Sequence, residues 1–109
     1  MKRIVAVAVT MVLAIALSAQ NASQLRLLTG QVMDRSEAGV PNAVVYLKNT
    51  KTLAVKTFIT DGNGQYRFPA LSRNVDYEVY AEYQGRKSET KTLSSFDSRQ
   101  TAQINLRLP

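Results

Sequence analysis

Residues 77–83 contain the sequence YEVYAEY, which is the clearest strand of the chain and the best guide to its fold. Apolar and polar side chains alternate here with a period of two, as on a sheet with one buried face. One face would carry Tyr77, Val79, Ala81 and Tyr83, and the opposite face Glu78, Tyr80 and Glu82. A one-residue shift of register would bury both carboxylates, so the pattern decides which face meets the core.

Six more segments have extended character, and turn residues separate them from one another. They cover residues 27–34, 43–49, 55–60, 65–68, 86–93 and 101–108. Pro69 is expected to end the fourth of the seven strands, and the polar segment 86–93 is suited to a sheet edge. The sequence therefore predicts an all-β fold, a seven-stranded antiparallel Greek-key β-sandwich with no helix in residues 27–109.

For three apolar residues, the alternation of the strands does not by itself predict whether the side chain is buried. Leu71 follows Pro69 and is expected to close the bottom of the core from a loop. Phe96, in the loop 94–99, is expected to pack inward as an anchor. Phe58 falls on the same side of its strand as a lysine, so either this ring is exposed or a β-bulge changes the register.

The N-terminal segment has the composition of a secretory signal peptide. Lys2 and Arg3 precede residues 4–17, an apolar run interrupted only by a threonine, and the small residues Ser18 and Ala19 follow. The run is shorter than the roughly 20 residues that cross a bilayer, but it fits the central region of a signal peptide. We expect cleavage close to Ala19.

This interpretation divides the chain into three parts. Residues 1–19 are the signal peptide, residues 20–26 a flexible mature N-terminus, and residues 27–109 the folded domain. The protein is expected to be exported, to the periplasm or the extracellular space, with no stable membrane anchor after cleavage. An uncleaved membrane anchor is the alternative.

The chain has 109 residues, enough for one domain, and contains neither Cys nor His. A catalytic centre of the Ser-His-Asp or Cys-His type is therefore excluded, as are the usual zinc ligand sets. Without disulfides, stability must come from the β core. We expect no enzymatic activity, no catalytic residues, no cofactor and no metal site.

The charge of the chain is basic but dispersed. It has 14 Lys and Arg against 8 Asp and Glu, and loss of Lys2 and Arg3 would leave 12 basic residues and a net charge of +4. Nucleic-acid binding usually requires a clustered basic face, and no run of basic residues occurs here. No nucleic-acid partner is expected.

Four short motifs occur in order along the chain. They are Gly-x-Val-x-Asp at 30–34, Gly-x-Pro-x-Ala-x-Val-x-Leu at 39–47, Thr-Asp-x-x-Gly-x-Tyr-x-Phe-x-x-Leu at 60–71 and Tyr-x-Val at 77–79. In this order and spacing they resemble the carboxypeptidase regulatory-like domain, and the resemblance extends over residues 27–108. One departure is that Asn74, Val75 and Asp76 stand where the family often has a glycine, so Asn74 is expected to take a left-handed conformation.

The resemblance implies a transthyretin-like (prealbumin-like) sandwich. Domains of this family accompany carboxypeptidases, outer-membrane transporters and adhesins, where they serve as rigid folding or docking modules. The resemblance implies no peptidase activity for this chain. It favours an exported structural or interaction module whose partner is a protein or polysaccharide of the cell envelope.

Asp61, Asn63 and Gln65 alternate like the beginning of a calcium-binding loop. The EF-hand pattern requires Gly at its sixth position and an acid at its twelfth, and here these positions are Tyr66 and Ser72. A hairpin turn in which Asp61 accepts backbone N–H bonds is the better interpretation.

Tyr46 and Tyr80 are the candidate contact residues for a partner or ligand. Both are aromatic and lie on strand faces predicted to point outward. Exposed aromatic rings can anchor a protein partner or stack on sugar rings, so a carbohydrate-binding module is the alternative function. The alternative that each tyrosine only covers the surface of the sheet and binds nothing stays open.

Overall fold

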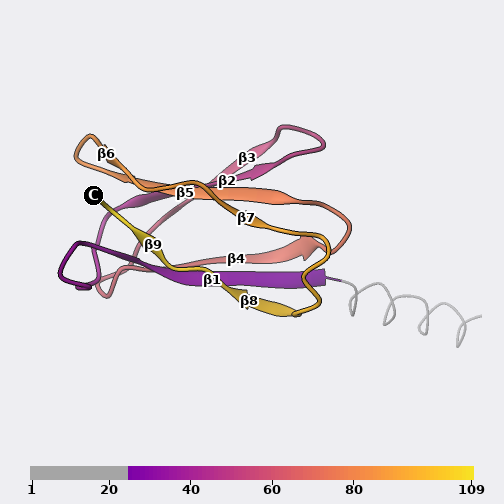
Figure 1. Ribbon diagram of the computed structural model, residues 1–109, viewed down its shortest axis with the longest axis horizontal. Coiled ribbons are helices and arrows are strands. Elements are labelled where there is room, and N and C mark those ends of the chain that lie inside the picture. Colours follow the sequence, from indigo (N-terminus) through magenta and orange to yellow (C-terminus); the bar gives the residue numbers. More distant parts are fainter. Residues whose placement is uncertain (1–24) are drawn as a thin grey trace, which may run out of the picture.

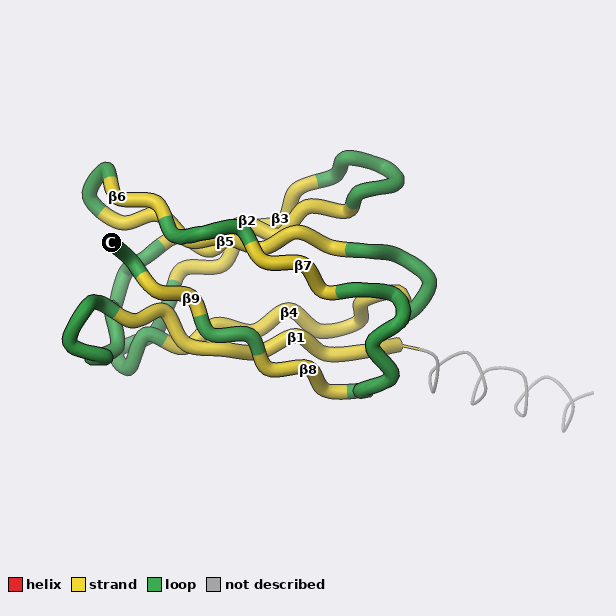
Figure 2. Tube along the Cα trace, in the orientation of Figure 1, coloured by secondary structure: helices red, strands yellow, loops and turns green. Residues whose placement is uncertain are grey.

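The computed structural model describes residues 25–109, which form two β-sheets packed face to face (Figures 1 and 2). The first sheet consists of β4 (Gln65–Ser72), β1 (Leu25–Met33), and β8 (Thr101–Gln103) with β9 (Leu106–Arg107) on the far side of β1. The second consists of β3 (Val55–Ile59), β2 (Val44–Asn49), β5 (Tyr77–Tyr83), and β6 (Arg86–Lys87) with β7 (Lys91–Leu93) beyond β5. In these residues no helix is long and apolar enough to cross a membrane. The expected signal peptide, 1–19, lies outside the described residues.

The predicted all-β sandwich is confirmed, with one difference in strand direction. β1 is antiparallel to β4 but parallel to β8 and β9, so the first sheet is mixed rather than wholly antiparallel. The cause is the path of the chain. It leaves the second sheet after β7, crosses through residues 94–100, and enters the first sheet beside β1 in the same direction (Figure 1).

The seven expected strands become nine because two of them are interrupted. The segment 86–93 is broken by a bulge, since the cross-strand partners change from Glu82–Lys87 to Val79–Lys91. Three steps along β5 therefore correspond to four along its neighbour. Ser88 fills the bulge, because its hydroxyl oxygen accepts the N–H of Ala81 at 2.9 Å.

The second interruption divides 101–108 at Ile104 and Asn105. The N–H of Ile104 still donates to the carbonyl of Thr29 at 2.9 Å. At the next position the side chain of Asn105 replaces the backbone, and its Oδ1 accepts the N–H of Gln31 at 3.1 Å. The pairing of β1 with β8 before the break and with β9 after it therefore keeps the same register.

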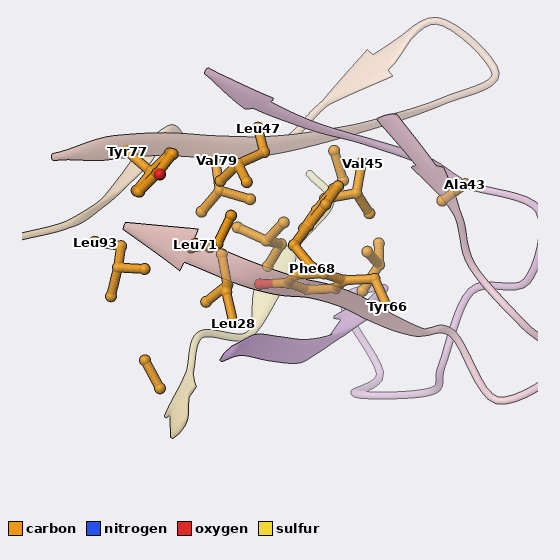
Figure 3. Packing of buried hydrophobic residues seen from close by; sticks show 14 of the residues in the cluster. Leu28, Ala43, Val45, Leu47, Tyr66, Phe68, Leu71, Tyr77, Val79 and Leu93 are labelled. Atoms are coloured by element: carbon orange, nitrogen blue, oxygen red, sulfur yellow. The ribbon is translucent and has the colours of Figure 1, made fainter. Parts of the chain in front are cut away.

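The hydrophobic core lies between the sheets and follows the alternation predicted from the sequence. Val79 and Ala81 are fully buried and lie beside the inward residues of β2, Leu47 and Val45. Figure 3 shows Val45, Leu47 and Val79 on one side of the core and Leu28 and Leu71 on the other. Leu71 is 1 % exposed, as expected, but it belongs to β4, because that strand continues through Pro69 to Ser72. The expectation that Pro69 ends the strand was wrong. β4 is an edge strand, where a residue without an N–H is tolerated.

The residues of the shared motifs hold the two sheets and their turns together. An added Cβ at Gly30 would lie 1.9 Å from the carbonyl oxygen of Ile104, so only glycine allows β1 to approach the last segment. The buried hydroxyl of Thr60 donates to Val40 O at 2.7 Å and accepts the N–H of Ala43 at 2.9 Å. These motif residues are therefore structural.

Three expectations about individual residues need correction. Phe58 is neither exposed nor displaced by a bulge: it is half-buried, and its ring packs against Phe68 at a centroid distance of 6.1 Å in an unbroken register. Asn74 has no positive φ, whereas Ala70 and Gln84 do. Strand β1 begins at Leu25, inside the segment 20–26 that was expected to be flexible.

Phe96 does not pack inward. Its side chain is 95 % exposed, because the space beneath its loop is filled by the guanidinium group of Arg26, which is fully buried. The guanidinium donates to the carbonyl oxygens of Ser94 at 3.1 Å and Arg99 at 3.0 Å. The loop is thus fixed from below by a cation, and the aromatic ring is left outside.

Candidate functional site

Tyr46 and Tyr80 lie directly opposite each other on β2 and β5. Their rings are stacked, with a centroid distance of 4.9 Å and an interplanar angle of 15°. The ammonium of Lys87 lies 4.3 Å from the centre of the Tyr80 ring, a cation–π contact that holds this ring on its outer side. Both tyrosines are half-buried on the outer face of the second sheet, so the two candidate residues form one paired site.

The tyrosine pair lies in a surface that we call the tyrosine face. It is the outer face of the second sheet and consists of Val44, Tyr46, Lys48, Val55, Thr57, Ile59, Glu78, Tyr80 and Glu82. Val55 and Ile59 leave 54 % and 64 % of their surface exposed. The face therefore combines an aromatic pair with exposed β-branched side chains, and the charged residues lie at its margins.

A second surface is a groove of about 650 Å³ between the two sheets, lined by Arg35, Lys87, Lys91, Arg107, Glu89 and neighbouring residues. Most of its cations have partners within the domain. Lys91 donates to the carbonyl of Asn105 at 2.7 Å, Arg107 pairs with Glu37 at 3.0 Å, and Lys87 lies on Tyr80. These side chains therefore connect the two sheets, and among the described residues the groove does not present a cluster of free cations that could bind an anion.

The carboxylates near the turns act as acceptors for backbone N–H groups. Oδ1 of Asp34 accepts N–H bonds from Ser36 and Ala38, and Oδ1 of Asp61 accepts them from Asn63 and Gln65. The predicted role of Asp61 in a hairpin turn is thus confirmed. Hydrogen bonds from Ser36 hold the pKa of Asp34 below its usual value. A carboxylate bound in this way stays ionised and closes its turn.

The remaining polar groups of the interior are also structural. The hydroxyl of Tyr66 donates to the carbonyl of Ile104, and burial raises its pKa above the ordinary range. Such a phenol is neither a base nor a nucleophile at neutral pH. Within residues 25–109, no group of three or more His, Cys, Asp or Glu side chains could hold a metal ion.

Two prominent residues could not have been chosen from the sequence. Arg26 falls in the segment 20–26 that was expected to be flexible, and Phe96 was expected to pack inward as an anchor. The two exchange roles, because the guanidinium can satisfy two loop carbonyls and the Asp97 carboxylate at 3.7 Å, which an aromatic ring cannot. The only available signal was that Arg26 lies two residues before Leu28, on the face of the strand that the alternation predicts to be buried.

Comparison with known proteins places the fold. Residues 28–109 match the model of a family described as "Carboxypeptidase regulatory-like domain". No curated protein sequence matches the chain at a significant level. Among solved structures, catechol 1,2-dioxygenase from Acinetobacter sp. is similar, with 15 % identity, a TM-score of 0.58, and coverage of 79 % of this chain and 52 % of the enzyme.

The major pilin subunit of Bacillus cereus is also similar, with 14 % identity, a TM-score of 0.59, and coverage of 78 % of this chain and 30 % of the pilin. The chain thus spans about half or less of these structures. At such identities the likeness extends to the sandwich fold alone, because one fold carries many functions.

Proposed function

Because the chain belongs to the carboxypeptidase regulatory-like domain family, we propose that it is an exported, non-catalytic module that binds another protein of the cell envelope. The observation that carries the proposal is the tyrosine face, a surface with a stacked aromatic pair and exposed apolar side chains. Interfaces are enriched in tyrosine, and its ring covers a large area with few rotatable bonds.

Several features support the non-catalytic part of the proposal. The chain has no His or Cys, and four aspartates of the domain are occupied by backbone or loop hydrogen bonds, namely Asp34, Asp61, Asp76 and Asp97. The tyrosine face holds no nucleophile paired with a base. An enzyme of this size would need such a constellation in a cleft.

The ring stacking favours a protein over a sugar. Tyr46 and Tyr80 stack on each other, so each ring has one of its two faces already occupied within the domain. The exposed side chains beside them, Val55 and Ile59, add apolar area without hydrogen-bonding groups. A carbohydrate ligand is the second candidate, favoured by the ring pair itself, which could present an aromatic surface to a pyranose.

The test is a binding experiment with the variant Tyr46→Ser/Tyr80→Ser. Wild-type protein, the double variant and Phe96→Ser are each immobilised and exposed to cell-envelope proteins and, separately, to envelope polysaccharides. Phe96→Ser is the matched control, because it removes an exposed ring away from the tyrosine face. We expect the double variant to fold and to bind its partner at least about thirtyfold more weakly, since a hot-spot tyrosine contributes about 2 kcal/mol.

The outcomes separate the candidates. Loss of a protein partner in the double variant but not in Phe96→Ser supports the proposal. Loss of a polysaccharide instead supports the carbohydrate alternative. A folded double variant that binds everything as the wild type does would show that the two tyrosines only cover the sheet. Turnover of a peptide, ester or glycoside by the pure protein would overturn the non-catalytic assignment.

A further inference from the structure

We propose that β3 is a self-association edge, at which two copies of this chain pair their β3 strands antiparallel about Thr57. The pairing would join the two second sheets into one continuous sheet. It goes beyond binding at the tyrosine face, because it uses the backbone of the strand and has a second copy of the chain as its partner.

The hydrogen bonds of the β2–β3 hairpin show which backbone groups are free. The backbone N–H of Thr60 donates to the carbonyl of Ala43 at 2.9 Å, and the backbone N–H of Asn49 donates to the carbonyl of Ala54 at 2.9 Å. In an antiparallel pair, every second residue directs both of its backbone groups toward the neighbouring strand. The even-numbered residues of β3 therefore bond to β2, and Val55, Thr57 and Ile59 direct theirs away from the sheet. β3 pairs with β2 alone among the described strands.

The free edges of the other outer strands each carry a feature that blocks pairing. β4 contains Pro69 and a register shift near Ala70, whose φ is 61°. The edge made by β8 and β9 is interrupted at Asn105, and β6 and β7 are separated by the Ser88 bulge. Bulges, prolines and short strands are the usual means by which proteins protect a sheet edge.

β3 has few of these protections. Its five pairs with β2 run without a register shift, and the strand contains no Pro or Gly. Val55 and Ile59 are largely exposed, and so is Leu53 at 64 %, in the hairpin that projects from one end of the second sheet (Figure 1). Unlike the other edges, it offers a partner an uninterrupted strand whose outward-directed residues, Val55, Thr57 and Ile59, are all β-branched.

The strand is complementary to itself. If Thr57 lies opposite Thr57 of the second copy, Val55 lies opposite Ile59, and all three outward-directed residues form hydrogen-bonded pairs. The side chains in contact on the outer face are then β-branched, a favourable cross-strand combination. The single charge of the strand, Lys56, lies opposite Phe58 rather than opposite its own copy, so pairing places no like charges directly opposite each other.

The first test is sedimentation of the purified protein over a range of concentrations, with Thr57→Pro as the variant. The N–H of Thr57 points away from β2, so proline removes no hydrogen bond within the hairpin but blocks the centre of the proposed interface. We expect a wild-type monomer–dimer equilibrium and a monomeric Thr57→Pro. Thr57→Val, which keeps the N–H, should still dimerise. A protein that is monomeric at every concentration would overturn the proposal.

The second test does not depend on tolerance of proline. Val55→Glu and Ile59→Lys should each weaken dimerisation, by about tenfold, because each sets a charge against an apolar side chain twice in the dimer. The double variant Val55→Glu/Ile59→Lys should dimerise again, because the carboxylate introduced in one copy would then face the ammonium introduced in the other. Within one chain these positions are about 13 Å apart, so they cannot pair with each other. Failure of the double variant to recover would exclude the proposed register.

The Tyr46→Ser/Tyr80→Ser variant separates the two proposals. Its β3 edge is unchanged, so it should dimerise as the wild type does even if it no longer binds an envelope partner. Loss of dimerisation in this variant would place the self-contact on the tyrosine face and contradict pairing through β3.

Discussion

At the scale of single residues, the domain depends on a few positions where one backbone closely approaches another. Gly30, Gly39 and Gly64 occupy such positions, and an added Cβ would lie within 3 Å of backbone atoms at each. Gly64 also has a φ of +77°, a conformation that side chains other than glycine rarely adopt. These glycines belong to the family motifs, which explains physically why the motifs take this form.

Gly30→Ala tests this explanation. Its Cβ would meet the carbonyl of Ile104 at 1.9 Å, so β1 and the last segment would have to separate. We expect the free energy of unfolding to fall by about 2–3 kcal/mol or more, as in overpacked cores. Urea denaturation measures the loss. Gly62→Ala is the control, because no atom lies within 4 Å of the added Cβ, and it should change stability little.

Arg26→Ala should also be strongly destabilising. The change leaves the carbonyls of Ser94 and Arg99 without their donors and removes the cation beside Asp97. A loss of about 3 kcal/mol is expected, because a fully buried side chain is removed and part-buried acceptors lose a charged donor. Arg107→Ala, which removes a salt bridge between exposed groups, should cost less than about 1 kcal/mol. Equal losses in the two variants would contradict a structural role for Arg26.

At this scale the sequence predicted strand residues better than loop residues. The inward positions Val79 and Ala81 and the outward positions Tyr46 and Tyr80 followed from alternation, because register is fixed by which face is buried. The alternation within 101–108 places Ile104 on the inward face of its strand, yet this residue is only half-buried, since the strand breaks there. Arg26 and Phe96 were missed because their places depend on contacts between distant segments.

At the scale of elements, two aspartates accept hydrogen bonds from the loop 94–100, one from outside the loop and one from within it. The N–H of Ser95 donates to Oδ1 of Asp76 at 2.6 Å, and Asp97 forms a bidentate contact with Arg99, with 2.7 Å between Oδ2 and the guanidinium. The bonds to Arg99 and the nearby Arg26 lower the pKa of Asp97, and the bonds to Ser95 lower that of Asp76. The loop is therefore tied down by ionised carboxylates.

A dependence of stability on acid pH follows. A carboxyl group whose pKa is lowered in the folded state contributes stability above its unfolded pKa and loses it as the pH falls through the folded value. Unfolding free energy should therefore decrease as the pH drops below about 4, near the ordinary value of 3.8 for these groups. Asp97→Asn should be less stable at pH 7 and lose less on acidification. Parallel pH profiles for the two proteins would exclude this role of Asp97.

The positions of the strands and the residues that face the core could be predicted from the sequence, but the interruptions within two strands could not. The segments 86–93 and 101–108 appear continuous in the sequence, since Ser88 and Asn105 fit an ordinary polar position of a strand. They act differently because their side chains replace backbone hydrogen-bond partners, which depends on the opposing strands. The parallel direction of β8 was also missed. It is set by the point at which the chain crosses from the second sheet to the first, which the sequence does not reveal.

At the scale of the whole molecule, the four sheet edges and the two outer faces are unequal. Three edges are blocked by a bulge, a proline or a break, and β3 is left with its backbone groups free. The tyrosine face adjoins that same strand, because Thr57 lies opposite Tyr46. The surfaces proposed for a partner and for a second copy are thus neighbours, and a dimer would carry two tyrosine faces on one continuous sheet.

The last prediction concerns processing of the chain at its N-terminus. Residues 1–19 have the basic start, apolar run and small residues of a signal peptide, and β1 begins at Leu25. Cleavage close to Ala19 would leave all of β1, including the buried Arg26, in the mature protein. Intact-mass measurement of protein recovered from the periplasm or medium should show the loss of about 19 residues. A mature species that retains Lys2 and Arg3 would instead favour the uncleaved anchor, and a cut beyond Arg26 would be incompatible with the folded domain.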